Sequence, residues 1–179
     1  MINEEIILFC NELKQKFSES STIVQVQSEY YSIQSCIKEP NKLYVFGDNT
    51  WRVGKGGQAV IRDLINVFGI ATKVAPGVNN WDYFKDELNT LSVIFKDISN
   101  LVHICSHKRY KFLIFPKEGL GTGLSEMPTR APESYKIMVQ CLNEIFGTTY
   151  EHSVINAGGV LDPDKFKGFI SGFGPEYNH

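Results

Sequence analysis

The chain has 179 residues, of which 42% are apolar and 21% are charged, and this composition is typical of one globular domain that can bury a hydrophobic core. Its formal charge of −2 argues against broad electrostatic affinity for nucleic acid, while leaving room for a local basic patch. No apolar run approaches the roughly 20 residues that a membrane-spanning helix needs, and the acidic N-terminus lacks the basic segment of a signal peptide.

The first half of the chain predicts a helix, two strands and a second helix. Residues 3–19 carry apolar side chains at helical spacing, and residues 23–26 form a short run rich in β-branched residues. Residues 43–46 are four consecutive apolar residues, as in a strand that is buried on both faces. A helix is then expected over residues 56–68, with Gly69 as its C-terminal stop.

The second half of the chain alternates in the same way. A short strand is expected over residues 70–75 and a long amphipathic helix over residues 81–107. Residues 112–115 form another fully apolar strand, a helix follows over residues 129–146, and a last strand at residues 153–155 precedes an irregular tail. This alternation predicts an α/β fold with a mostly parallel sheet covered on both faces, in which ligands bind beyond the carboxyl ends of the strands.

Cysteine and histidine spacing points to no disulfide framework and no metal site. The cysteines are widely scattered, no CxxC pair occurs, and the histidines show no metal-ligand spacing. We therefore expect reduced cysteines in or near the core, no metal, no cofactor and a cytoplasmic location. The cysteines are Cys10, Cys36, Cys105 and Cys141.

Two glycine-dense turns are the most informative feature of the sequence. Residues 47–57 contain four of the 15 glycines and residues 119–123 contain three, and each turn lies between an expected strand and an expected helix. Glycine lets the backbone approach a ligand closely and adopt a positive φ, and free N–H groups at a helix start suit a phosphate. We call residues 54–57 the first glycine turn and residues 119–123 the second, and we expect a diphosphate between them.

The spacing of these glycines excludes two familiar phosphate-binding motifs. A P-loop requires GxxxxGK followed by serine or threonine, whereas Gly54-Lys55 has no glycine at the required distance before it and is followed by Gly56. A dinucleotide-binding fingerprint requires GxGxxG after the first strand, whereas the chain opens with a helix and continues from Gly57 as Gln58-Ala59.

Three segments together resemble the macrodomain family. They are RVGKGGQAV at residues 52–60, IATK at residues 70–73 and FPKEGLGTGL at residues 115–124. In order and spacing they are similar to the branch of small macrodomain glycohydrolases that remove ADP-ribose from carboxylate side chains, with one residue inserted in the first segment and two in the third. The resemblance covers residues 43–146 and implies a three-layer α/β/α macrodomain-like fold with a mixed, mostly parallel sheet.

The resemblance also implies roles for individual residues. Lys73 would attack the C1″ carbon of the ribose, assisted by an aspartate just after the Gly-Leu pair at the end of the second glycine turn. The chain has Ser125 at that position, and a serine supplies no carboxylate charge near neutral pH. Glu118 is the preferred substitute as the assisting acid, with Asp48 and Glu126 as alternatives.

The residues expected to contact the ligand lie in or beside the two glycine turns. Lys55 has the alternative of a plain surface turn, and Lys73 that of a solvated lysine at a strand end. Asp48 and Asn49 could cap the following segment or contact ribose hydroxyls. The expected ligand-binding residues are Asn49, Gly54, Lys55, Gly56, Gly57, Gln58, Gly119, Leu120, Gly121, Thr122, Gly123 and Leu124.

Three functions remain open from the sequence. The chain could hydrolyse an ADP-ribosyl linkage, with an ADP-ribosylated protein as a further partner. It could instead be a non-catalytic sensor or sequestering protein for an NAD-derived nucleotide, which Ser125 favours, or an interaction module without a nucleotide. All readings expect one domain over residues 1–179, with residues 1–40 as an N-terminal extension and residues 163–179 as an irregular tail, and none expects a membrane partner.

Overall fold

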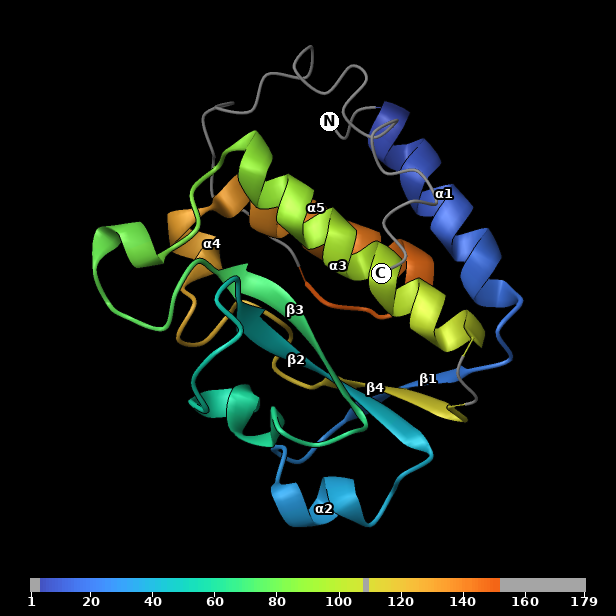
Figure 1. Cartoon of the computed structure of the whole chain (residues 1–179). Coiled ribbons are helices and arrows are strands. Elements are labelled where there is room, and N and C mark those ends of the chain that lie inside the picture. The colour runs from blue at the N-terminus through green and yellow to red at the C-terminus, as the bar shows by residue number, and fades with distance from the viewer. Residues whose placement is uncertain (1–3, 108–109, 152–179) are drawn as a thin grey trace.

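In this computed structural model, residues 4–107 and 110–151 are described, and they form a parallel sheet with helices on both faces (Figure 1). The strand order is β1-β4-β2-β3, and all three pairings between these strands are parallel. The strands are β1 (Ile23–Gln27), β2 (Lys42–Asn49), β3 (Val67–Lys73) and β4 (Phe112–Pro116).

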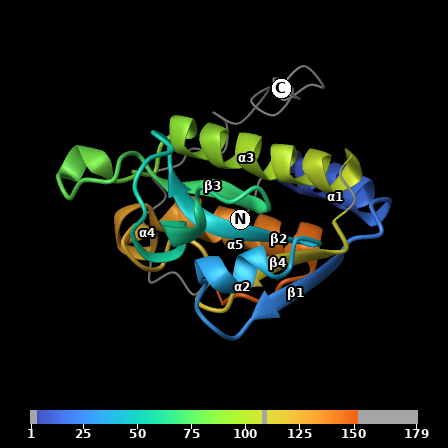
Figure 2. The same cartoon turned by 60° about the horizontal axis from the view of Figure 1, so that its bottom comes forward.

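The helices form the two outer layers of the fold. Figure 2 shows α3 and α2 on opposite sides of the sheet, and α1, α3 and α5 contact one another. The expected three-layer α/β/α architecture is therefore confirmed for the described residues. The helices are α1 (Glu4–Ser18), α2 (Ile33–Ile37), α3 (Leu88–His107), α4 (Met127–Arg130) and α5 (Pro132–Phe146), with 3₁₀ turns η1 (Gly57–Ile61) and η2 (Asn80–Asp82).

The alternation of side chains along β2 divides the hydrophobic core into two parts. Leu43 and Val45 belong to the larger cluster, which includes residues of α1, α3 and α5. Tyr44 and Phe46 point the other way and belong to a smaller cluster with residues of α2 and η1. A strand that buries apolar side chains on both faces explains why residues 43–46 form a continuous apolar run.

The prediction of a helix over residues 56–68 is wrong beyond the first turn. Only the five residues of η1 are helical, and Val67 and Phe68 already belong to β3, paired with β2. Asn66 anchors the start of β3, because its buried side-chain amide donates to the carbonyls of Cys36, Glu39 and Lys42. Tertiary hydrogen bonds therefore end the helix earlier than the apolar pattern suggests.

Of two other expected helices, one begins later than predicted and one is divided in two. The helix expected from residue 81 begins at Leu88, and residues 80–82 form η2 instead. The helix expected over residues 129–146 is two helices, because Pro132 interrupts the backbone hydrogen bonding after Ala131. The short α2 was not expected, and the strand expected at residues 153–155 lies outside the described residues.

The N-terminal segment takes part in the same layers as the rest of the domain. β1 pairs with β4 along its whole length, and α1 buries Ile6, Phe9 and Leu13 against the larger core cluster. The segment expected to be an extension therefore completes the sheet and one helical layer. The tail at residues 163–179 lies outside the described residues.

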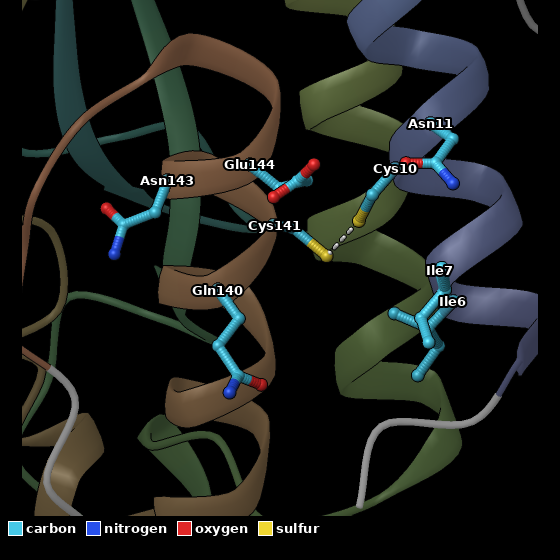
Figure 3. Close-up of a pocket in the computed structure, with 8 residues that line it drawn as sticks. All are labelled: Ile6, Ile7, Cys10, Asn11, Gln140, Cys141, Asn143 and Glu144. Atoms are coloured by element: carbon cyan, nitrogen blue, oxygen red, sulfur yellow. Dashed lines mark hydrogen bonds between the residues drawn. The ribbon is translucent and has the colours of Figure 1, made fainter.

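The contact between α1 and α5 includes two of the four cysteines. Figure 3 shows Cys10 and Cys141 facing each other, with their sulfur atoms 2.7 Å apart. They border a cavity of about 460 Å³, which is also lined by polar side chains such as Asn143 and Glu144. All four cysteines are free and buried, as the sequence predicts.

No helix in the described ranges is long and apolar enough to cross a membrane. Within the same residues, no cluster of three or more His, Cys, Asp or Glu side chains is arranged to bind a metal ion.

Candidate ligand-binding site

The candidate site is a cavity of about 520 Å³ at the carboxyl end of the sheet. All four strands contribute to it, each from its carboxyl end or from the segment that follows, as expected for a parallel α/β sheet. Both glycine turns border the cavity, although they are far apart in the sequence. The described lining residues are Tyr30, Tyr31, Gly47, Gly56, Gly57, Gln58, Thr72, Glu118, Gly121, Thr122, Gly123, Leu124 and Ser125.

The two glycine turns offer unused backbone donors to this cavity. Gly119 and Gly121 have φ values of 79° and 81°, with Leu120 between them at negative φ. Such alternation is typical of anion-binding concavities. Here the amide of Gly119 already donates to the carbonyl of Pro116 at 3.1 Å, so the donors left for a ligand in this turn are those that follow it. Within the described residues, the amide groups of Gly56 and of residues 121–124 donate no hydrogen bond. They are therefore available to a ligand.

Gln58 links the two glycine turns and sets their separation. Its Oε1 accepts a hydrogen bond of 2.8 Å from the amide of Gly47, at the end of β2. Its Nε2 donates to the carbonyl oxygen of Gly119 and to Oε1 of Glu118, each at 2.9 Å. Both side-chain N–H groups are thus used within the protein, so Gln58 supports the cavity wall more than it serves a ligand.

Thr72 and Ser125 place two hydroxyl groups on the cavity wall. The Thr72 hydroxyl donates to the carbonyl of Asp48 at 3.2 Å, and its Oγ1 lies 2.6 Å from Oγ of Ser125. Because the single Thr72 proton is used in that bond, Ser125 is the donor between the two hydroxyls. Ser125, at the position where the resemblance expects aspartate, therefore presents free lone pairs as a neutral acceptor.

Aromatic and apolar side chains form the rest of the wall. Tyr31 is buried, and its hydroxyl lies 2.7 Å from the carbonyl oxygen of Val45. Burial raises the pKa of Tyr31 well above its usual value, so the phenol is neutral at physiological pH. Tyr30 and Leu124 are 84% and 69% exposed at the rim. Their exposed surface is therefore available for contact with a ligand.

Lys73, the expected nucleophile, is not among the described lining residues. Its ammonium donates to the carbonyl of Gly77 at 2.5 Å and lies 4.2 Å from the ring centre of Tyr83. The side chain is buried, and this burial lowers the pKa of Lys73 against the opposing effect of the Asp82 and Glu126 carboxylates. Thr72 lines the cavity, whereas the Lys73 side chain that follows it is engaged elsewhere.

Asp48, the alternative acid, is also absent from the described cavity lining. Its buried carboxylate is paired with Arg52 at 3.3 Å and with Arg62 at 2.5 Å. Arg52 continues to Asp97 on α3 at 2.7 Å, and Asp97 accepts a hydrogen bond from the amide of Ala71 on the edge strand β3. Burial raises the pKa of Asp97, with Arg52 acting against this shift. Asp48 is thus the centre of a charge network.

This charge network positions the first glycine turn. Arg62 donates to the carbonyls of Gly54 and Val53, and the side-chain amide of Asn49 also donates to Val53. Lys55 is exposed and paired with Asp63. The contacts of Asn49 and Gly54, both expected to bind the ligand, therefore hold the first glycine turn in place.

Some of the remaining residues expected to contact the ligand line the cavity, and others lie behind its wall. Gly56, Gly57, Gln58 and Glu118 line the cavity, as do residues 121–124. Gly119 and Leu120 are buried behind the wall, and Leu120 belongs to the larger core cluster. Glu126 is ion-paired with Arg130.

The sequence reasoning missed four wall residues and undervalued a fifth. Tyr30 and Tyr31 follow β1 directly, so the rule that ligands bind beyond strand ends could have identified them. Gly47 stands at the end of β2, where a Cβ would lie 3.3 Å from Oγ1 of Thr72. Thr72 itself is inconspicuous beside Lys73 in the sequence, and Ser125 was noted only as a missing aspartate.

A family model matches residues 26–141 of the chain, and its description is "Family of unknown function (DUF7831)". The chain belongs to this family. The part of the chain that matches the DUF7831 family contains every described residue that lines the cavity, whereas α1 lies outside it. No curated protein and no solved structure matches the chain. The family description names no activity, so the ADP-ribose ligand stays a prediction.

Proposed function

We propose that the cavity binds ADP-ribose or an ADP-ribose-containing nucleotide derived from NAD. The observation that carries this proposal is the convergence of both glycine turns, which the sequence predicts as diphosphate-binding, on one cavity with unused amide donors. Backbone donors in such a concavity suit an anion without a cationic side chain.

The other wall groups suit the sugar and base of such a nucleotide. The cavity volume of about 520 Å³ is within the usual range for small-molecule sites. Ser125 and Glu118 present acceptors for ribose hydroxyls, and Tyr30 offers an exposed ring for stacking. These contacts are needed, because hydrogen bonds from the five unused amide groups, at about 1.5–3 kcal/mol each, hardly exceed an association cost of about 4–15 kcal/mol.

Titration calorimetry with ADP-ribose tests the proposal. The expected result is a Kd in the micromolar range, which corresponds to about −8 kcal/mol, and a loss of affinity of at least about tenfold in Gly123→Glu through like-charge repulsion. Gly123 is the best place to block the cavity, because a Cβ there has no atom within 4 Å and no left-handed φ opposes a side chain. Unchanged affinity in a folded Gly123→Glu would contradict the proposed site.

Gln15→Glu is the matched control for this variant. It makes the same change in net charge at an exposed position on α1, and it should leave the Kd unchanged.

Hydrolysis of an ADP-ribosyl linkage is a second candidate, favoured by one observation. Burial lowers the pKa of Lys73, which increases the fraction of nucleophilic amine, and Lys73 directly follows the wall residue Thr72. For attack on a ribose, its ammonium would have to leave the Gly77 carbonyl and the Tyr83 ring. The resting contacts therefore favour binding over catalysis.

Lys73→Ala separates the two candidates. A binding protein should keep its ADP-ribose Kd within about twofold, because groups without shared contacts are energetically independent to about 0.5 kcal/mol. A hydrolase that uses Lys73 should lose at least about 100-fold in turnover of an ADP-ribosylated peptide. Mass spectrometry of the peptide measures this turnover, with Lys136→Ala on the exposed face of α5 as the control. Turnover that persists in Lys73→Ala would exclude the nucleophile role.

A further inference from the structure

The cavity combines free amide donors with a single charged side chain, and that side chain is acidic. Among the described lining residues, Glu118 is the only Asp, Glu, Lys or Arg. Gln58 fixes one oxygen of this carboxylate through a hydrogen bond of 2.9 Å. A negative charge therefore stands on the wall of a cavity whose backbone donors suit an anion.

Three cations of the neighbouring elements have partners other than Glu118. Arg62 is bound to Asp48 and to backbone carbonyls of the first turn, Lys55 is paired with Asp63, and Lys73 donates to Gly77. None of these three side chains lines the cavity. The repulsion between Glu118 and a ligand phosphate is thus reduced by solvent and salt but not by these neighbours.

A carboxylate at such a position accepts hydrogen bonds from hydroxyl groups and repels phosphates. The phosphates of a nucleotide must then lie along the glycine amides, with a ribose next to Glu118. Given the proposed nucleotide-binding function, on which this step rests, we infer that Glu118 selects a ribose with free hydroxyls and rejects a nucleotide that is phosphorylated on that ribose.

The test compares three ligands by calorimetry: ADP-ribose, ADP-ribose 2′-phosphate and ADP-ribose 2″-phosphate. The two phosphorylated forms carry the extra group on opposite riboses, so they also report which ribose lies beside Glu118. We expect at least one of them to bind about tenfold or more weakly than ADP-ribose. In Glu118→Gln this ratio should fall to within about threefold, because the amide removes the charge but keeps the shape and the acceptor for Gln58.

Glu126→Gln is the matched control. Glu126 flanks the second glycine turn but is ion-paired with Arg130 and lies outside the described cavity lining, so the ratio should stay at the wild-type value. Discrimination retained in Glu118→Gln, or equal binding of all three ligands to the wild type, would overturn the inference and leave nucleotide binding intact. Failure of the wild type to bind ADP-ribose would instead overturn the proposed function and the inference with it.

Discussion

Gly121→Ala is expected to lower the free energy of unfolding by about 2–5 kcal/mol. Gly121 has a φ of 81°, where an L side chain costs about 1–2 kcal/mol. Its Cβ would also lie 2.8 Å from Sδ and 3.2 Å from Cβ of the buried Met127, and overpacking of this kind costs about 1–3 kcal/mol. Urea unfolding of the purified variant measures the loss.

Gly123→Ala is the control for this prediction, because its added Cβ has open space and no left-handed φ. Its stability should change by no more than about 0.5 kcal/mol. Equal stability of the two alanine variants would show that the second glycine turn is not built as described. If Gly121→Ala retains enough folded protein for calorimetry, its affinity for ADP-ribose should also fall, because Met127 must shift and move the turn.

Asp48→Asn is expected to lower the free energy of unfolding by about 3–5 kcal/mol, the usual effect of removing one partner from a buried ion pair. The Asp48 carboxylate is 4% exposed and its partner Arg62 is 13% exposed. With asparagine the shape is kept, but the largely buried charge of Arg62 loses its counter-ion. Thermal and urea unfolding measure the effect.

Asp63→Asn provides the matched control, since it makes the same chemical change in an exposed ion pair with Lys55. Surface pairs contribute about 0–1 kcal/mol, so this variant should unfold close to the wild type. The Asp48 result also bears on mechanism. An Asp48→Asn variant of unchanged stability that loses turnover of an ADP-ribosylated peptide would mean that Asp48 is an acid catalyst and not the anchor of the first glycine turn.

The fold could be predicted where a pattern has one physical cause. The four apolar residues at 43–46 predict a strand buried on both faces, and β2 indeed divides its side chains between two core clusters. The pattern failed over residues 56–68, because an apolar residue every three or four positions also fits a 3₁₀ turn followed by a strand. The decisive contacts there come from Asn66, whose three carbonyl partners belong to a distant segment.

The sequence indicated which backbone segments form the candidate site better than it indicated which side chains do. Glycine clustering reports directly on backbone geometry, and both turns line the cavity. The charge of Asp48 suggested chemistry, whereas in the structure its carboxylate is paired with Arg52 and Arg62. A charged residue at a strand end has the same appearance in a sequence whether it faces a ligand or an arginine.

The amino-acid sequence by itself determined the alternation of strands and helices, the two glycine turns and their place beyond strand ends, because these depend on local backbone preference and periodic burial. Tertiary structure alone decided that Lys73 faces Tyr83, that Asp48 is neutralised by arginines, and that Ser125 and Glu118 share one wall. The physical reason is that side-chain direction and charge pairing depend on which distant segments meet, and strand order brings β2 and β4 together only in the folded sheet.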